Sequence, residues 1–295
     1  MTTLKRTALH VAFLAGCMAT GPLAASASCP TTTAQIAMQT NDLNAVRSIY
    51  DDVRFNSECS NTLRTQMRDS LATLYLDAAK TTSGTARVER LQEALRLGRT
   101  WEYQVALGEA LMQVQDYDEA AVHLQNAINR LNDNHIEVAI NEPEAMRIVR
   151  LATTSIALAE RPVETPLTRS GNTGGVFAPS VRGFMVRELP VHVTFEFDSV
   201  VFTQDGFRRA NDLATALREQ PNREITLEGQ TDPLGSETYN MNLSLRRAEA
   251  VRDFLYANGF QGVINVIPRG EEVPPILDSG LVFDQEQTTT LARRV

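Results

Sequence analysis

Lysine is almost absent from this 295-residue sequence: only Lys5 and Lys80 occur, and the other basic residues are arginines. Lysine and arginine together number 28 against 36 aspartates and glutamates, so the formal net charge is −8. Affinity for nucleic acid comes mostly from neutralising phosphates. An acidic chain without a basic run is therefore expected to have no nucleic-acid partner.

The sequence also lacks the short motifs of common enzymes. It contains no G-x-S-x-G elbow, no H-E-x-x-H zinc motif and no phosphate-binding glycine loop. Histidines number four and cysteines three, and no histidine joins the cysteines at a metal-ligand spacing. We therefore expect no catalytic residues, no metal and no cofactor, and we favour binding over catalysis.

The N-terminus has the features of an export signal. Lys5 and Arg6 precede a mostly apolar stretch at 7–20, which is too short to span a membrane. An A-x-A cleavage site follows and ends at Ala27. We predict that residues 1–27 are a signal peptide. Its removal takes two basic residues and no acidic ones, which leaves a charge of −10.

A second interpretation of this segment stays open. Leu14-Ala15-Gly16-Cys17 resembles a bacterial lipobox, in which Cys17 would be acylated and become the mature N-terminus. We favour cleavage near Ala27, because the Gly21-Pro22 break and the A-x-A site would otherwise have no explanation. Both interpretations predict export.

Cleavage leaves one pair of cysteines, Cys29 and Cys59. In an oxidising periplasm this pair is a candidate disulfide, worth about 3 kcal/mol in the chain-entropy model. The alternative is two buried free thiols, which the polar neighbours of both residues disfavour.

Residues 28–161 show a helical pattern that repeats. Leu74, Leu91 and Ala94 are echoed 33 residues later by Leu107, Leu124 and Ala127. The unit at 101–134 resembles a tetratricopeptide repeat, with small residues where two helices cross and large ones where they pack. Residues 142–161 are typical of a terminal capping helix. Such stacks usually bind a partner protein, and a rigid spacer is the competing interpretation.

The remaining chain divides into a linker and a second domain. Residues 162–187 are rich in proline, glycine and small polar residues, which predicts a flexible tether. Residues 188–295 alternate strands with helices, beginning with a clean alternation at 191–197 and including a strand at 264–267. This order predicts helices packed on one side of a small mixed sheet, and an α+β fold overall.

A turn and the helix after it carry the strongest functional signal. Asp232-Pro233-Leu234-Gly235 is a good type I turn, and Ser236 suits a helix N-cap. On the helix, one predicted face carries Asn240, Leu243, Arg247, Ala250 and Phe254. An acid, an amide and a guanidinium would thus face one pocket. This set suits a ligand that carries both an amine and a carboxylate.

The stretch at 229–251 resembles the signature of OmpA-like domains, which bind peptidoglycan. Gln230 stands where histidine is usual in that family. The segment that ends in Asp198-Ser199 resembles the family's F-x-F-D-S, and the turn at 270–275 resembles its G-x-G-E-x-x-P without the first glycine. The last residues, 291–295, have alanine where the family usually has asparagine before Arg-Arg-Val, and the final strand is shortened.

The resemblance implies an α/β sandwich and a set of peptidoglycan-binding residues. In it, Asp232 pairs with the ammonium of diaminopimelate in the stem peptide, and Arg247 forks onto the carboxylate. Asn240 matches the family's amide position. The expected site is completed by Thr231, Leu243, Asp198 and Arg293.

The expected function is thus wall anchoring of an exported protein in the periplasm of a Gram-negative bacterium, with a protein partner on the helical half. Membrane association is expected only through a lipid on Cys17 or through a partner. Three alternatives remain open. In the first, Asp232 is only a turn residue and Arg247 is only one end of a structural ion pair with it. In the second, the chain is a protein-binding scaffold that the wall domain only localises. The third is a wall hydrolase or its activator.

Overall fold

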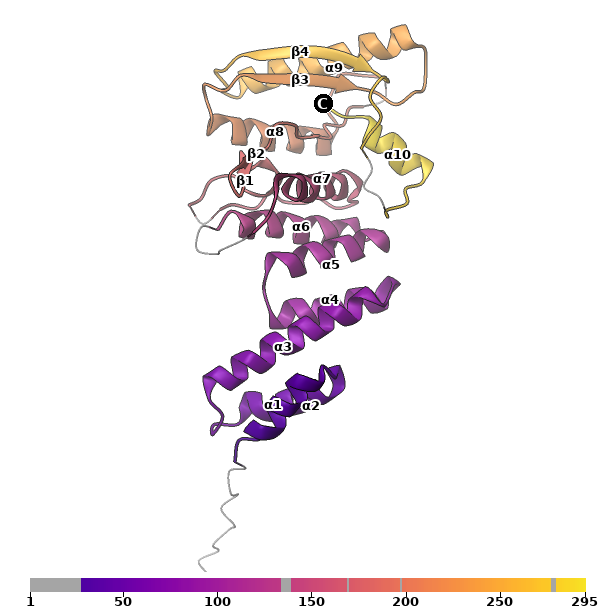
Figure 1. Ribbon diagram of the computed structural model, residues 1–295. Helices are drawn as coiled ribbons and strands as arrows, with labels where there is room; N and C mark the ends of the chain where they lie inside the picture. The colour runs from indigo at the N-terminus through magenta and orange to yellow at the C-terminus, as the bar shows by residue number, and fades with distance from the viewer. Residues whose placement is uncertain (1–27, 134–138, 169, 197, 277–279) are drawn as a thin grey trace, which may run out of the picture.

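The computed structural model describes residues 28–133, 139–168, 170–196, 198–276 and 280–295 (Figure 1). The predicted signal peptide and Cys17 lie outside these residues. None of the described helices is both long and apolar enough to cross a membrane.

Seven helices form the first half of the described chain and stack along it from bottom to top in Figure 1. They are α1 (Thr31–Thr40), α2 (Leu43–Phe55), α3 (Asn61–Lys80), α4 (Gly84–Leu97), α5 (Trp101–Gln113), α6 (Tyr117–Leu131) and α7 (Glu142–Leu158). Polar side chains cap the N-termini of several of them, among them Ser60, Thr100, Asp116 and Asn141. The helical prediction for this half is confirmed.

The predicted small residues lie where helices cross. At Gly108 of α5, a Cβ atom would lie 2.6 Å from Cγ of Leu124 on α6, so only glycine lets the two helices pack this closely. The helices α3 and α4 form one close pair, and α5 and α6 form the next. Their arrangement fits the tetratricopeptide-like pattern, and α7 packs on α6 as the predicted last helix.

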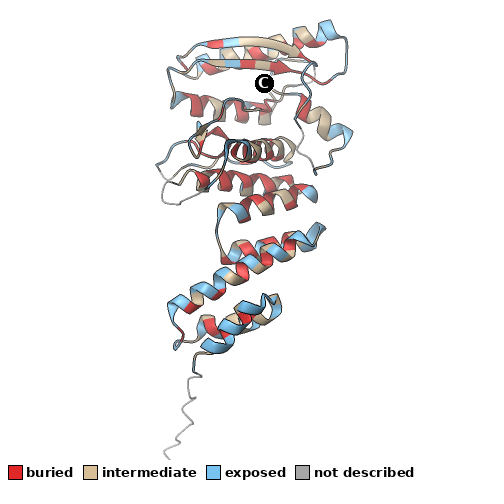
Figure 2. Cartoon of the chain, viewed as in Figure 1, coloured by how far each residue is buried: buried red, intermediate tan, exposed pale blue. Residues whose placement is uncertain are grey.

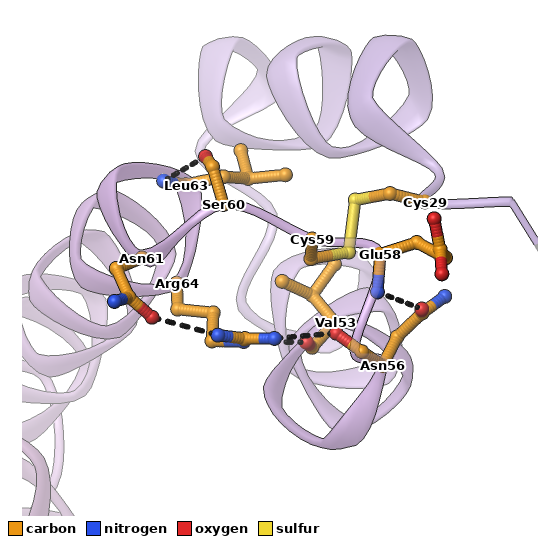
Figure 3. Close-up of a disulfide and its surroundings, with 9 residues drawn as sticks. All are labelled: Cys29, Val53, Asn56, Glu58, Cys59, Ser60, Asn61, Leu63 and Arg64. Carbon is orange, nitrogen blue, oxygen red and sulfur yellow. Dashed lines mark hydrogen bonds between the residues drawn. A yellow bond between two sulfur atoms is a disulfide. The ribbon is translucent and has the colours of Figure 1, made fainter.

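The predicted disulfide is present and fastens the first helices together (Figure 3). Cys29 precedes α1 and Cys59 lies between α2 and α3, with their Cα atoms 5.0 Å apart. Close by, Nη2 of Arg64 on α3 donates to the carbonyl oxygen of Asn56 at 2.5 Å. Together these contacts hold the end of α2 against the start of α3.

The prediction of a flexible tether at 162–187 is wrong for the described part of this segment. It holds a short 3₁₀ helix, η1 (Gly175–Phe177), and a hairpin of β1 (Ser180–Val181) and β2 (Phe184–Met185). Val176 and Phe177 are buried in the main hydrophobic cluster. Asn129 of α6 accepts a hydrogen bond from the Gly175 amide at 2.8 Å. The glycines and prolines here shape a packed connection.

The C-terminal part contains α8 (Gln204–Arg218), β3 (Ile225–Gln230), α9 (Glu237–Ala257), β4 (Ile264–Gly270) and α10 (Gln285–Ala292). The strands β3 and β4 pair in parallel, with Ile225 opposite Ile264. The connecting helix α9 packs along both strands. This arrangement confirms the α+β fold class.

The strand predicted at 191–197 is not regular in the described residues. Only one isolated bridge forms, between Phe195 and Phe202. Consecutive residues Val191, His192 and Val193 are all buried, because the C-terminal tail lies on this segment. The amide of Val295 donates to the carbonyl oxygen of Val191 at 3.1 Å. The tail itself has no strand where a short last strand was expected.

The two halves share one hydrophobic core. A single cluster of buried residues runs from α3 to β4, and α10 packs on α7. Polar contacts cross the same junction: Thr165 donates to Asp212 of α8 at 2.8 Å. Buried residues accordingly continue from α5 upward through this junction in Figure 2, while α1 to α4 are more exposed.

Candidate functional site

The candidate site lies where β3 ends and α9 begins. Gly229 near the end of β3 permits this geometry, because a Cβ atom there would lie 2.1 Å from the carbonyl oxygen of Ser244. The Ser244 hydroxyl in turn accepts a hydrogen bond from the Gly270 amide at 3.1 Å. The helix is therefore fixed closely against the ends of both strands. Sequence analysis did not single out Ser244, which a search for small residues one turn from Asn240 would have found.

Asp232 is buried, and both of its carboxylate oxygens have partners. Oδ1 accepts a hydrogen bond from the Leu234 amide at 2.9 Å, which forms the predicted turn. Oδ2 pairs with Nε of Arg293 from the C-terminal tail. The side chain of Asp232 is 11% exposed and that of Arg293 is 49% exposed. The Asp232 carboxylate is therefore buried, whereas its partner Arg293 is half-exposed at the surface.

Arg247 of α9 is half-buried and has no carboxylate partner in the described part of the chain. Its Nε donates to the carbonyl oxygen of Ser199 at 3.3 Å, and its guanidinium lies 5.0 Å from the ring centroid of Phe195. Burial lowers the pKa of Arg247, and the charge of Arg293 lowers it further, while Asp232 acts in the opposite direction. The charges of Asp232 and Arg293 therefore both act on Arg247, in opposite directions.

Asn240 lies beneath the turn and is almost fully buried. Its side-chain amide donates to the carbonyl oxygen of Asp232 at 3.3 Å and to the Glu271 carboxylate at 2.6 Å. The amide therefore ties the Asp232 turn to the end of β4. Glu271 directly follows β4, and a bond across 31 residues gives no local signal in the sequence.

Asp198 lies in a loop and contacts α9 through a hydrogen bond, whereas Leu243 lies within α9. Asp198 has a left-handed backbone, with φ of 50°, and accepts a hydrogen bond from the Tyr239 hydroxyl of α9. The pKa of Tyr239 is raised mainly by this bond. The contact holds the loop at 198–202 beside Arg247. Leu243 is buried on α9.

Two buried oxygens next to Asp232 have no hydrogen-bond partner among the described residues. They are Oγ1 of Thr231 and Oε1 of Gln230. Buried polar atoms in proteins are nearly always paired with protein or water. These two are therefore exceptions to that rule, and both lie directly before Asp232 in the chain.

The described structure thus joins Asp232 and Arg293 in one ion pair, and both of these charges act on the pKa of Arg247. The helix face differs slightly from the predicted one. The buried residues of α9 are Asn240, Leu243, Ser244, Ala248, Val251 and Leu255, and Arg247 lies at the border of this row. No group of three or more metal-ligating side chains occurs among the described residues.

Comparisons with known proteins identify this part of the chain. Residues 194–280 match the model of the OmpA family. A peptidoglycan-associated lipoprotein of Haemophilus influenzae is 32% identical, over 35% of this chain and 71% of that protein. One from Brucella melitensis is 37% identical, over 32% of this chain and 58% of that protein.

Two further similarities cover different shares of the matched proteins. Outer membrane porin F of Pseudomonas aeruginosa is 35% identical, over 30% of this chain and 26% of that protein. A crystal structure of the peptidoglycan-associated lipoprotein from Burkholderia pseudomallei is 31% identical and covers 35% of this chain and 83% of that one, with a TM-score of 0.28. This chain thus spans about a quarter of the porin's length and more than half of the length of the Haemophilus and Brucella lipoproteins.

Proposed function

Because the chain belongs to the OmpA family, we propose that its C-terminal domain binds peptidoglycan non-covalently through diaminopimelate of the stem peptide. The observation that carries this proposal is Arg247. Its guanidinium is half-buried with no carboxylate partner in the described residues, and burying an uncompensated charge is costly. A ligand carboxylate would compensate this charge and can accept two parallel hydrogen bonds from the guanidinium.

Asp232 supplies the other pole of the site. A ligand ammonium reaches its Oδ2 by sharing it with Arg293 or by displacing the exposed Arg293 side chain. The unpaired Thr231 hydroxyl lies beside this position and can complete the hydrogen bonding. Asp232 and Arg247 would thus offer one contact for an ammonium group and one for a carboxylate, as a zwitterionic ligand requires. Within this proposal Asn240 positions the turn, Asp198 positions the loop beside Arg247, and Leu243 supports the helix.

Sedimentation of the purified full-length chain with isolated sacculi tests this function. Arg247→Ala removes the proposed carboxylate contact, and a hydrogen-bonded charge contributes about 1.5–3 kcal/mol, so binding should weaken by about 10- to 150-fold. Asp232→Asn should also weaken binding. Arg246→Ala is the matched control, because Arg246 is the exposed neighbour on the same helix. Undiminished sedimentation of the Arg247 variant with a normal circular dichroism spectrum would refute the proposal.

We infer that the chain binds the wall and does not cleave it. In the proposed site both oxygens of the Asp232 carboxylate already accept hydrogen bonds, from the Leu234 amide and from Arg293, which suits a binding role for this side chain. A zymogram with purified chain should show no cleared band.

The proposed location is the periplasm, at the wall and the outer membrane. The Cys29–Cys59 disulfide supports export to an oxidising compartment. Mass spectrometry of the mature N-terminus distinguishes cleavage near Ala27 from acylation of Cys17. The helical half is proposed to bind a partner protein that the chain anchors.

A further inference from the structure

A groove of about 890 Å³ lies in the helical half. One wall is the face of α4 that carries Gln92, Leu95, Arg96 and, just after the helix, Arg99. The other wall is the face of α6 from His123 to Arg130, and α5 contributes Gln104 and Leu107. Since ligand pockets commonly measure about 300–1,000 Å³, the groove is large enough to hold a ligand.

The groove is positive within an acidic chain. Three arginines line it, Arg96, Arg99 and Arg130, against one acid, Asp133. Arg96 is already paired with Glu93 at 2.7 Å. The side chains of Arg99 and Arg130 make no hydrogen bond or ion pair with any described residue. The two guanidinium groups of Arg99 and Arg130 therefore favour an anionic ligand, and the planar geometry of a guanidinium suits a carboxylate.

The groove also presents amide groups without partners. The side chains of Gln92 and Asn126 make no hydrogen bond with any described residue. A side-chain amide donates and accepts at once, as a peptide group does, so the two pair well. A polyanion without amide groups cannot pair with Gln92 and Asn126 in this way, so these two side chains favour a peptide over a simple polyanion.

His123 adds an acceptor beside these amides. Its Nδ1 lies 2.7 Å from Oε1 of Gln104, and because an amide oxygen only accepts, Nδ1 carries the proton. Burial lowers the pKa of His123, although Glu119 and Asp116 of the same helix oppose this, so the ring is neutral. Its Nε2 is then free to accept a hydrogen bond from a backbone N–H.

From these groups we infer that the groove binds an extended acidic segment of a partner protein. This inference rests on the proposed partner role of the helical half. The walls from Gln92 to Arg99 and from His123 to Arg130 are each about 10 Å long, enough for about three extended residues. The peptide backbone lies over Asn126 and Nε2 of His123, its carboxylates meet Arg99 and Arg130, and an apolar side chain packs on the half-buried Leu95.

Fluorescence anisotropy with the full-length, disulfide-bonded chain tests this inference. The probe is a fluorescein-labelled octapeptide of alternating glutamate and leucine, and the matched probe has glutamine in place of glutamate. We expect the glutamate probe to bind and the glutamine probe to bind at least about tenfold more weakly. Arg99→Gln with Arg130→Gln should weaken the glutamate probe by about tenfold. Asn126→Leu should also weaken it.

The control removes the same number of charges elsewhere. Arg47→Gln with Arg187→Gln changes two exposed arginines outside the groove and should leave binding unchanged. Equal loss in this control, equal binding of both probes, or no binding would overturn the inference. Competition by inorganic polyphosphate that matches or exceeds the peptide, with Asn126→Leu unaffected, would assign the groove to a simple polyanion instead. Sacculus sedimentation of the groove variant should stay normal, so failure here is distinct from failure of wall binding.

Discussion

His192 should make the stability of this protein depend on pH. The ring is buried where the C-terminal tail meets the segment before α8, and its Nε2 donates to the carbonyl oxygen of Leu291 at 3.3 Å. Burial lowers its pKa to about 4, and the charges of Arg294 and Arg209 act in the same direction. Protonation would place a positive charge in this buried junction, where the charges of Arg294 and Arg209 oppose it.

The direction and the size of this pH effect follow from the difference between the pKa of His192 in the folded and in the unfolded chain. An unfolded histidine has a pKa of about 6.5, so the unfolded chain takes up a proton at a higher pH than the folded chain. The contribution of neutral His192 is complete above about pH 6.5 and is lost as the pH falls toward about 4. At about 1.4 kcal/mol per pKa unit, about 2 kcal/mol is lost at pH 5 and about 3 kcal/mol in full.

Urea denaturation followed by circular dichroism at pH 7.5 and at pH 5 measures this loss. His192→Gln keeps a donor for Leu291 and cannot titrate, so it should lose about 2 kcal/mol less than the parent chain between the two pH values. Other groups titrate equally in both proteins and cancel in this difference. Identical losses in the two chains would refute the reasoning.

Two further substitutions test the packing. Gly229→Ala places a methyl group against the carbonyl oxygen of Ser244, so α9 must move from β3, and we expect a loss of about 2–4 kcal/mol in thermal or urea unfolding together with weaker sacculus binding; an unchanged melting temperature would contradict the close contact. Cys29→Ser with Cys59→Ser opens a loop that spans 30 residues, which should lower the stability of the first helices by about 3–4 kcal/mol and expose them to limited proteolysis first; equal protease resistance with and without the disulfide would contradict this expectation.

Regular local patterns made much of the fold predictable. The 33-residue recurrence that includes Leu107 and Leu124 predicted the close pair of α5 and α6, and the helical pattern at 142–161 predicted α7. The tether at 162–187 was mispredicted because glycine and proline mark irregular backbone, whether it is free or packed. Val176 and Phe177 pack against α6 and α7, and no pattern within 162–187 reveals this contact.

The tail explains the other fold error. Alternation at 191–197 predicted a strand with one buried face, but His192 is buried together with Val191 and Val193, and the C-terminal residues bond to this segment at His192 and Val191. A contact across roughly a hundred residues leaves no signal in either segment alone.

The candidate site divides in a similar way. The turn at Asp232 and the helical position of Arg247 follow from local sequence, and the structure contains both the turn and the helix. The ion pair of Asp232 with Arg293 and the bond of Arg247 to Ser199 depend on tertiary contacts over 61 and 48 residues. The ligand roles of these residues remain predictions.

The most direct measurement of the central claim is competition for sacculi by small molecules. Meso-diaminopimelate carries the second carboxylate proposed to bind Arg247, and lysine is the same chain without that carboxylate. The account predicts that diaminopimelate releases the bound protein from sacculi, and that lysine at equal concentration does not. Equal release by both compounds, or no release by diaminopimelate, would contradict it.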